Sequence, residues 1–154
     1  MTYPNKKVVI WGKGSIGTRH YKNLLKMGYK VYFLWKKNKK KKSIKKRDLK
    51  NLKPLFCVIC TPTIFHVRNA NFCLKNNIPT YIDKPLGYEE NDHEIKKILK
   101  FSKKQKIHGG FNLKYCKELN EFIKKIKKIK KIKTAEFIWR TDMRKWHPGE
   151  NYKK

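Results

Sequence analysis

The residues Val8-Val9-Ile10-Trp11-Gly12-Lys13-Gly14-Ser15-Ile16-Gly17, or VVIWGKGSIG, give the clearest indication of how the first part of this chain folds. It begins with a short apolar run that ends at a glycine, which is typical of a buried parallel strand. Apolar residues then recur at helical spacing over residues 15–28, and Gly28 is a natural stop for that helix. A second apolar run, at residues 31–35, predicts the next strand. This order of elements predicts a right-handed βαβ unit.

The same unit contains the pattern G-x-G-x-x-G. Alone this pattern is a weak signal for a phosphate-binding loop, but between a strand and a helix it is a strong one. In that context Gly12 permits a tight turn, Gly14 lets a pyrophosphate approach the backbone, and Gly17 lets helix and strand pack closely. Backbone N–H groups at the helix start, at Ser15 and Ile16, hold the phosphates together with the helix dipole. We therefore predict a nicotinamide dinucleotide site, and a glycine turn without a ligand is the alternative.

Apolar runs continue to alternate with helical patterns along the chain. We expect strands at residues 56–60, 80–82 and 107–111, helices at residues 65–76 and 92–104, and a loop with a short helix at residues 36–53. The helix expected at residues 92–104 should present four residues to the core, namely Ile95, Ile98, Leu99 and Phe101. Strands alternating with helices at this spacing predict an α/β fold of the Rossmann type. Ligands of such doubly wound parallel sheets bind beyond the carboxyl ends of the strands.

The pattern changes beyond Cys116. One helical face carries apolar residues and lysines fill most other positions; the apolar residues are Leu119, Phe122, Ile123, Ile126 and Ile129. Such basic amphipathic helices lie on membranes in some proteins, and packing of the apolar face on the sheet is the simpler interpretation. Residues 134–141 predict a strand. We therefore expect a dinucleotide-binding domain over residues 1–115 and a separate segment over residues 116–154.

The end of the second predicted strand bears on the choice between the two nicotinamide dinucleotides. An acidic residue about 20 residues beyond the glycines ordinarily accepts a hydrogen bond from the ribose 2′-hydroxyl. This sequence has Trp35, Lys36 and Lys37 there. Because two cations attract a 2′-phosphate, we expect NADP(H) to be favoured over NAD(H), with Trp35 and Lys36 as cofactor-binding residues. The alternative is that these lysines belong to the general lysine excess.

The composition bears on several other function classes. The chain has 154 residues and a formal net charge of +30. Its basic residues are nearly all lysine and are spread over almost every predicted surface. We interpret them as solvent-exposed residues that reflect a composition biased toward lysine. A groove that binds nucleic acid specifically is the alternative. No apolar run approaches the roughly 20 residues that span a bilayer, and no signal-peptide pattern begins the chain. A cytoplasmic protein without a membrane partner is expected.

The cysteines fit reduced thiols in that compartment. Cys57 and Cys60 form a C-x-x-C pair, which in redox and metal sites occupies a turn or a helix start. Here the pair lies inside an apolar run. We therefore predict core packing for these cysteines and no metal site.

Four segments, GKGSIGTRH, ICTPT, IDKPLG and GGFNLKY, follow one another along the chain. With them the sequence resembles the Gfo/Idh/MocA family, the oxidoreductases related to glucose–fructose oxidoreductase and inositol 2-dehydrogenase, from about Val8 to Tyr152. The resemblance implies that Thr61 and Pro62 border the cofactor. It also implies that Lys84, the lysine of the family's Glu-Lys-Pro motif, orients or protonates the reacting hydroxyl or carbonyl. A lysine at a partly buried cofactor site is chemically able to do so.

The sequence departs from the family's pattern at two motif positions. Asp83 replaces the usual glutamate and is expected to hold the cofactor ribose or Lys84 less well. Lys114 stands where the family often has arginine. A lysine there lacks the planar pair of hydrogen-bond donors that a guanidinium group provides. None of the histidines matches the family's catalytic histidine, and we interpret each as structural or exposed; they are His20, His66, His93, His108 and His147.

The resemblance implies an NAD(P)-dependent oxidoreductase that transfers hydride between nicotinamide and a sugar, sugar nucleotide or cyclitol. Relatives continue into a second α+β domain that binds the substrate, and this chain ends at Lys154, where that domain is expected to begin. We therefore interpret the chain as the cofactor-binding half, with a sugar-like substrate if another chain supplies the missing domain. The alternatives are a non-catalytic dinucleotide-binding module and a subunit of a split enzyme. Oligomerisation is compatible with either.

Overall fold

The computed structural model, which describes residues 6–34, 43–102, 107–138 and 140–142, begins with the predicted βαβ unit. This unit consists of β1 (Lys7–Trp11), α1 (Ser15–Lys26) and β2 (Lys30–Leu34). Gly28 follows α1 with a φ of 82°, a conformation that favours glycine and ends the helix as predicted. Trp35 and Lys36, which were predicted to bind the cofactor, lie outside the described residues.

The remaining elements continue the alternation. The further strands are β3 (Ser43–Ile44), β4 (Phe56–Ile59), β5 (Thr80–Ile82) and β6 (Ile107–Gly109). The further helices are α2 (Leu49–Leu52), α3 (His66–Lys75), α4 (Asp92–Ser102) and α5 (Lys117–Ile126). Short 3-10 turns occupy Lys46–Asp48, Thr63–Phe65, Glu89–Asn91 and Asn112–Tyr115. Among the described residues, no helix combines the length and the apolar character that a membrane crossing requires.

The described strands form one six-stranded sheet in the order β3-β2-β1-β4-β5-β6, and every neighbouring pair is parallel. At its centre β1 pairs with β4, with Val8 opposite Phe56 and Trp11 opposite Ile59. The direction of winding reverses between these two strands, as in other doubly wound folds. The predicted α/β fold of the Rossmann type is therefore confirmed.

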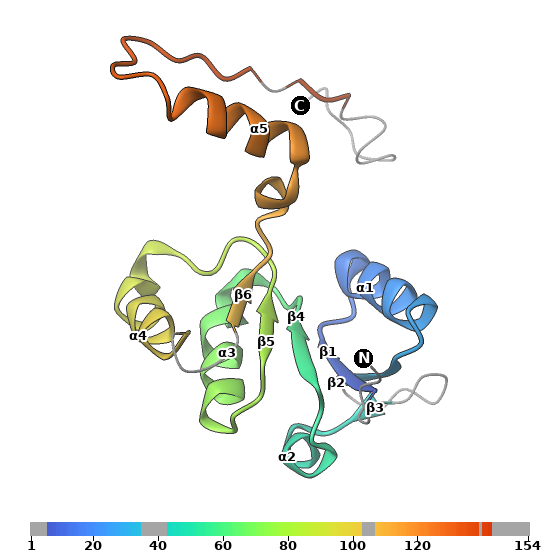
Figure 1. Cartoon of the computed structure of the whole chain (residues 1–154). Coiled ribbons are helices and arrows are strands. Elements are labelled where there is room, and N and C mark those ends of the chain that lie inside the picture. Colours follow the sequence, from blue (N-terminus) through green and yellow to red (C-terminus); the bar gives the residue numbers. More distant parts are fainter. Residues whose placement is uncertain (1–5, 35–42, 103–106, 139, 143–154) are drawn as a thin grey trace, which may run out of the picture. The chain divides into compact units, whose positions relative to one another are not determined.

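The two faces of the sheet carry different helices (Figure 1). Val9, Cys57 and Ile59 pack in one apolar cluster together with residues of α2, α3 and α4. Val8 and Ile10 point to the opposite face and join a second cluster, which contains Leu24 of α1. Side chains alternate between faces along a strand, so β1 contributes to both clusters. Cys57 is fully buried, which agrees with the core packing predicted for it.

The sequence prediction for the inner face of α4 is only partly correct. Ile98 is buried and Ile95 packs against the core, as predicted. Leu99 is 52% exposed, so its predicted core position is wrong. Consecutive residues of a helix point in directions about 100° apart, and the contact with the sheet is narrower than the apolar stripe. The side chain of Phe101 lies outside the described residues.

The chain divides into two compact units, Met1–Asn112 and Leu113–Lys154. The second unit contains α5, where the basic amphipathic helix was predicted, and no residue of α5 is buried. Burial of its apolar stripe is therefore not observed. The strand predicted at residues 134–141 is wrong, because the described residues of this stretch have no regular secondary structure. A strand needs a partner for its backbone groups, and the described part of this unit contains no other strand.

Candidate functional site

Two glycines of the loop after β1 are required by the packing of the chain itself. Gly12 has a φ of 122°, and a Cβ there would lie 2.5 Å from the carbonyl carbon of Cys60 and 2.8 Å from the nitrogen of Thr61. Gly17 is buried, and a Cβ there would overlap the carbonyl group of Gly12. The turn, α1 and the loop after β4 therefore fit together only because these positions lack side chains.

Gly14 differs from the other two glycines of the motif, Gly12 and Gly17. It is exposed, its φ of −65° suits any residue, and a Cβ there would meet nothing within 4 Å. It precedes α1, whose start has neither a side-chain cap nor an acidic residue in its first turn. The first backbone bond of the helix runs from the Thr18 nitrogen to the Gly14 oxygen, at 2.9 Å. The N–H groups of Ser15, Ile16 and Gly17 thus lie outside the helical ladder and form an open site suited to an anion.

The loop after β4 forms the second wall of this site. The Cys60 nitrogen donates to the oxygen of Trp11, the last residue of β1, at 2.8 Å, so backbone pairing with β1 continues past the end of β4. Thr61, which is half-buried, and Pro62, which is exposed, follow directly. The structure therefore brings the sequence-predicted Thr61 and Pro62 next to the glycine loop, at the point where the winding of the sheet reverses.

The loop after β5 carries Asp83, Lys84 and Pro85 at the same edge of the sheet. The Asp83 nitrogen donates to the Ile59 oxygen at 2.9 Å, and the peptide bond between Lys84 and Pro85 is cis. Asp83 is half-buried and Lys84 is exposed, so the partly buried setting expected for this lysine is not present in the chain alone. Any burial of Lys84 has to come from a ligand or from another part of the protein.

The Asp83 carboxylate affects two neighbouring groups on the α1 side of the sheet. Burial raises the pKa of the Cys60 thiol to about 12, and the negative charge of Asp83 adds to this shift. Burial lowers the pKa of His20, while Asp83 raises it and Arg19 lowers it further. Cys60 is therefore an unreactive thiol, which agrees with the structural role predicted for the C-x-x-C pair.

His66 is a site residue whose contacts the sequence did not reveal. It is only 2% exposed, and its two ring nitrogens lie 2.7 Å from the Thr61 oxygen and 2.8 Å from the Pro85 oxygen. Asn69, one helical turn further along α3, donates to the Thr61 hydroxyl oxygen at 3.1 Å. The start of α3 thus contacts both loops that carry predicted site residues.

Lys46 is a second residue that the sequence did not single out. Its ammonium group lies 4.3 Å from the centroid of the Phe72 ring and 5.3 Å from that of Trp11, the residue before Gly12. A cation held over aromatic rings is fixed more firmly than a free surface lysine, by about 0.5–1 kcal/mol. No sequence signal distinguishes Lys46 from the many lysines around it.

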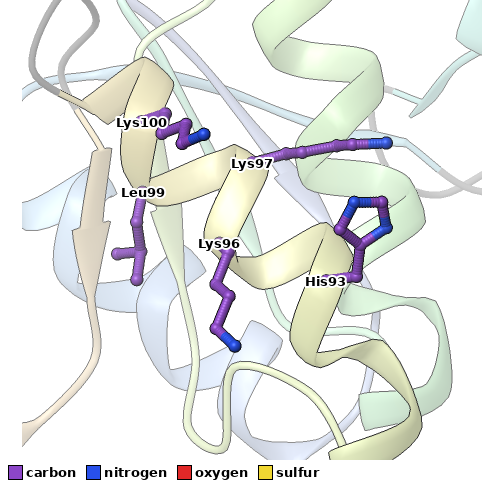
Figure 2. A pocket seen from close by; sticks show the side chains of 5 residues that line it. All are labelled: His93, Lys96, Lys97, Leu99 and Lys100. Atoms are coloured by element: carbon purple, nitrogen blue, oxygen red, sulfur yellow. The ribbon is translucent and has the colours of Figure 1, made fainter.

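A shallow hollow beside α4 lies apart from the predicted site residues. Its lining residues, which Figure 2 labels, are His93, Lys96, Lys97, Leu99 and Lys100. In this view His93 and Lys97 point to one side of the helix and Leu99 to the other, so these groups do not converge on one point. An apolar cavity of about 170 Å³ between α4, β5 and β6 has no polar side chain in its lining. Within the described residues, no group of three potential ligands could hold a metal ion.

Comparison of the sequence with protein-family models and with curated proteins gives no match. Solved structures do match. The myo-inositol 2-dehydrogenase from Lactobacillus plantarum has a TM-score of 0.64 and 21% identity over 78% of this chain and 40% of that chain. The WlbA (WbpB) dehydrogenase from Thermus thermophilus, in complex with NAD and UDP-GlcNAcA, has a TM-score of 0.67 and 15% identity over 81% of this chain and 48% of that chain. A Gfo/Idh/MocA family oxidoreductase from Vibrio cholerae has a TM-score of 0.58 and 23% identity over 75% of this chain and 43% of that chain.

These structures confirm the resemblance that the sequence motifs indicated. The described sheet and helices have the fold of the N-terminal portion of Gfo/Idh/MocA-type dehydrogenases. The chain covers between 40% and 48% of the length of these three proteins. This likeness shows the fold alone. The site residues are inferred from the geometry described above.

Proposed function

We propose that this chain is the dinucleotide-binding part of an oxidoreductase of the Gfo/Idh/MocA type. The observation that carries the proposal is the open space at Gly14. Packing within the chain explains glycine at positions 12 and 17, but a Cβ at position 14 would meet nothing within 4 Å. A glycine that the fold does not need is explained by a ligand that approaches the backbone closely, next to N–H groups that lack helical partners.

The residues at this edge of the sheet fit a nicotinamide dinucleotide. The pyrophosphate would contact the backbone of Gly12, Gly14, Ser15, Ile16 and Gly17. Thr61, Pro62 and Asp83 would border the nicotinamide half, whose ring supplies a carbon that accepts or donates hydride. Trp35 and Lys36 would lie at the adenosine ribose. Because Lys36 and Lys37 are cations where a carboxylate would select NAD(H), we propose that NADP(H) binds more tightly.

Lys84 is the proposed catalytic residue. Lys84 follows β5 at the edge of the sheet where the nicotinamide half would lie, and it is exposed. In this position it would hold a proton at the reacting oxygen of a substrate, donating it to a carbonyl or receiving it from a hydroxyl. The similar structures named for inositol and solved with UDP-GlcNAcA support a polyhydroxylated substrate. The second domain that the family resemblance implies would contact this substrate.

A titration of the purified chain with NADPH and NADH tests the proposal. Fluorescence or calorimetry gives the two dissociation constants for the unmodified chain and for Gly14→Ser. Serine is a favourable residue before a helix, so this variant is expected to keep its stability. Its side chain fills the space at Gly14 and accepts from the free N–H groups, so binding is expected to weaken at least about tenfold.

Each outcome of this titration has a separate meaning. Absence of binding by the folded, unmodified chain would refute the dinucleotide site. Equal binding by Gly14→Ser would refute the role given to Gly14. Tighter binding of NADH than of NADPH would overturn only the proposed preference for NADP(H).

A further inference from the structure

A single buried histidine connects the two loops of the proposed site. His66 is the first residue of α3 and is 2% exposed. Its Nε2 atom lies 2.7 Å from the backbone oxygen of Thr61, in the loop after β4. Its Nδ1 atom lies 2.8 Å from the backbone oxygen of Pro85, in the loop after β5. The two loops are otherwise separated in sequence by the whole of α3 and β5.

The chemistry of the two partners constrains the protonation state of the ring. Carbonyl oxygens only accept hydrogen bonds, so each contact needs an N–H group on the histidine. A neutral imidazole has one N–H and could satisfy only one of the two oxygens. An imidazolium has two, so only the doubly protonated ring can donate to both oxygens. Burial of an unpaired carbonyl beside a nitrogen lone pair would be unfavourable.

A second contact strengthens the connection on one side only. Asn69 is 5% exposed, and its side-chain nitrogen lies 3.1 Å from the Thr61 hydroxyl oxygen. The start of α3 therefore holds Thr61 through both its backbone and its side chain. Pro85, in contrast, is held through His66. His66 is thus the side chain that joins the Lys84 loop to the Thr61 loop, in addition to the backbone hydrogen bond from the Asp83 nitrogen to the Ile59 oxygen.

We propose that His66 is a positioning residue, which as an imidazolium donates to the Thr61 and Pro85 carbonyls and so fixes Lys84 relative to the bound cofactor. The effect on the cofactor rests on the proposed function. The connection between the loops does not, because it is present in the protein alone. Substitution of His66 is expected to let the two loops move independently while the sheet stays intact.

The protonation state is tested by NMR of the histidine ring nitrogens in the unmodified chain at about pH 6. We expect both nitrogens of His66 to carry a proton. His93, which is exposed, serves as the reference ring. A His66 ring with one protonated nitrogen would overturn the proposal, because one of the two carbonyls would then lack a donor. This measurement requires no variant and therefore does not depend on how well a variant folds.

The connection is tested by backbone hydrogen exchange of His66→Gln. A glutamine amide donates only from its nitrogen end, so it cannot serve both carbonyls. We expect exchange to rise at least about tenfold in the loops at residues 60–63 and 83–86, and to stay unchanged in β1. A uniform rise that includes β1 would show a merely structural role and would refute the proposal. Asn69→Ala is the matched control, and its effect should be confined to residues 60–63.

The consequence for ligand binding is tested by the dissociation constant of NADPH. We expect about a tenfold increase for His66→Gln and less than a twofold change for His93→Gln. Binding by His66→Gln that equals that of the unmodified chain would overturn the positioning role. If the unmodified chain binds neither dinucleotide, the proposed function fails, while ring protonation and hydrogen exchange still decide whether His66 joins the loops.

Discussion

Alanine substitution of Gly12 and Gly14 separates what the fold requires from what a ligand requires. The two positions share one loop and the same chemical change. At Gly12 the new Cβ would lie 2.5 Å from a backbone carbonyl carbon, in a backbone with a φ of 122°. At Gly14 the new Cβ would meet nothing within 4 Å, and the φ is −65°. We expect Gly12→Ala to be strongly destabilising and Gly14→Ala to be nearly neutral.

The magnitudes follow from these contacts. A residue forced into a sparsely populated backbone conformation costs about 1–3 kcal/mol, and overpacking against neighbouring atoms costs about 1–3 kcal/mol more. Gly12→Ala should therefore lower the free energy of unfolding by about 2–6 kcal/mol, a large part of the roughly 5–15 kcal/mol that stabilises a domain. Gly14→Ala loses only part of a helix-capping preference, up to about 1 kcal/mol.

Urea denaturation followed by far-ultraviolet circular dichroism measures both values, because the transition midpoint shifts with the free energy of unfolding. A Gly12→Ala variant within about 1 kcal/mol of the unmodified chain would refute the packing argument for the loop. A Gly14→Ala variant as unstable as Gly12→Ala would remove the basis for assigning this glycine to a ligand. Dinucleotide titration of the stable variant then gives the effect on binding separately.

Three other predictions concern single side chains of the first unit. Leu49 is fully buried, so Leu49→Ala is expected to lower the free energy of unfolding by about 2–5 kcal/mol in urea denaturation, and a loss below about 1 kcal/mol would show that it packs loosely. The pKa of Cys60 is raised from its ordinary value of 9.0 to about 12, so the stability that it contributes is complete below pH 9 and is lost as the pH rises through 12. At pH 8 its alkylation in the native protein should be much slower than in urea, and equal rates would contradict the raised pKa. Burial lowers the pKa of His20 from 6.5, so its contribution to stability is present above pH 6.5 and is lost as the pH falls; NMR titration of Asp83→Asn should show a still lower pKa, because the opposing carboxylate is gone.

Much of the fold could be predicted because local sequence patterns match the final structure. The apolar run before Gly12 and the helical period after it predicted β1 and α1 to within one or two residues. β5 was predicted with its observed bounds, since Thr80 to Ile82 is a short apolar segment between turn residues. The loops at the carboxyl ends of these strands followed from the topology, which places all of them at one edge of a parallel sheet.

The errors arise where a tertiary partner decides the outcome. β3 was not predicted, because two residues within a lysine-rich stretch show no periodicity and become a strand only through pairing with β2. The stretch at residues 134–141 has strand-like composition but no pairing partner in the described part of its unit. Helical period alone placed Leu99 in the core, whereas the limited contact area leaves it half exposed.

The same reason explains which site residues were missed. His66 was interpreted as structural or exposed, and its burial agrees with the first of these. Its two partners are backbone oxygens, one of them 19 residues away, and backbone atoms leave no mark in a sequence. Lys46 is defined by the rings of Trp11 and Phe72, which come from separate elements. Side chains whose role depends on such distant neighbours can be found only from the structure.

The pairing of β1 with β4 also determines when the site can form as the chain folds. The glycine loop belongs to the first βαβ unit. The second wall of the site, at Cys60 and Thr61, follows β4, which comes after the lysine-rich residues 36–53. Parallel strands need long connections, and closing such a loop is slow compared with forming a helix. During synthesis from the N-terminus, the proposed dinucleotide site is therefore incomplete until β4 has emerged and joined β1. A ligand that binds there stabilises the closed centre of the sheet, and it cannot act as a template for the earlier steps of folding.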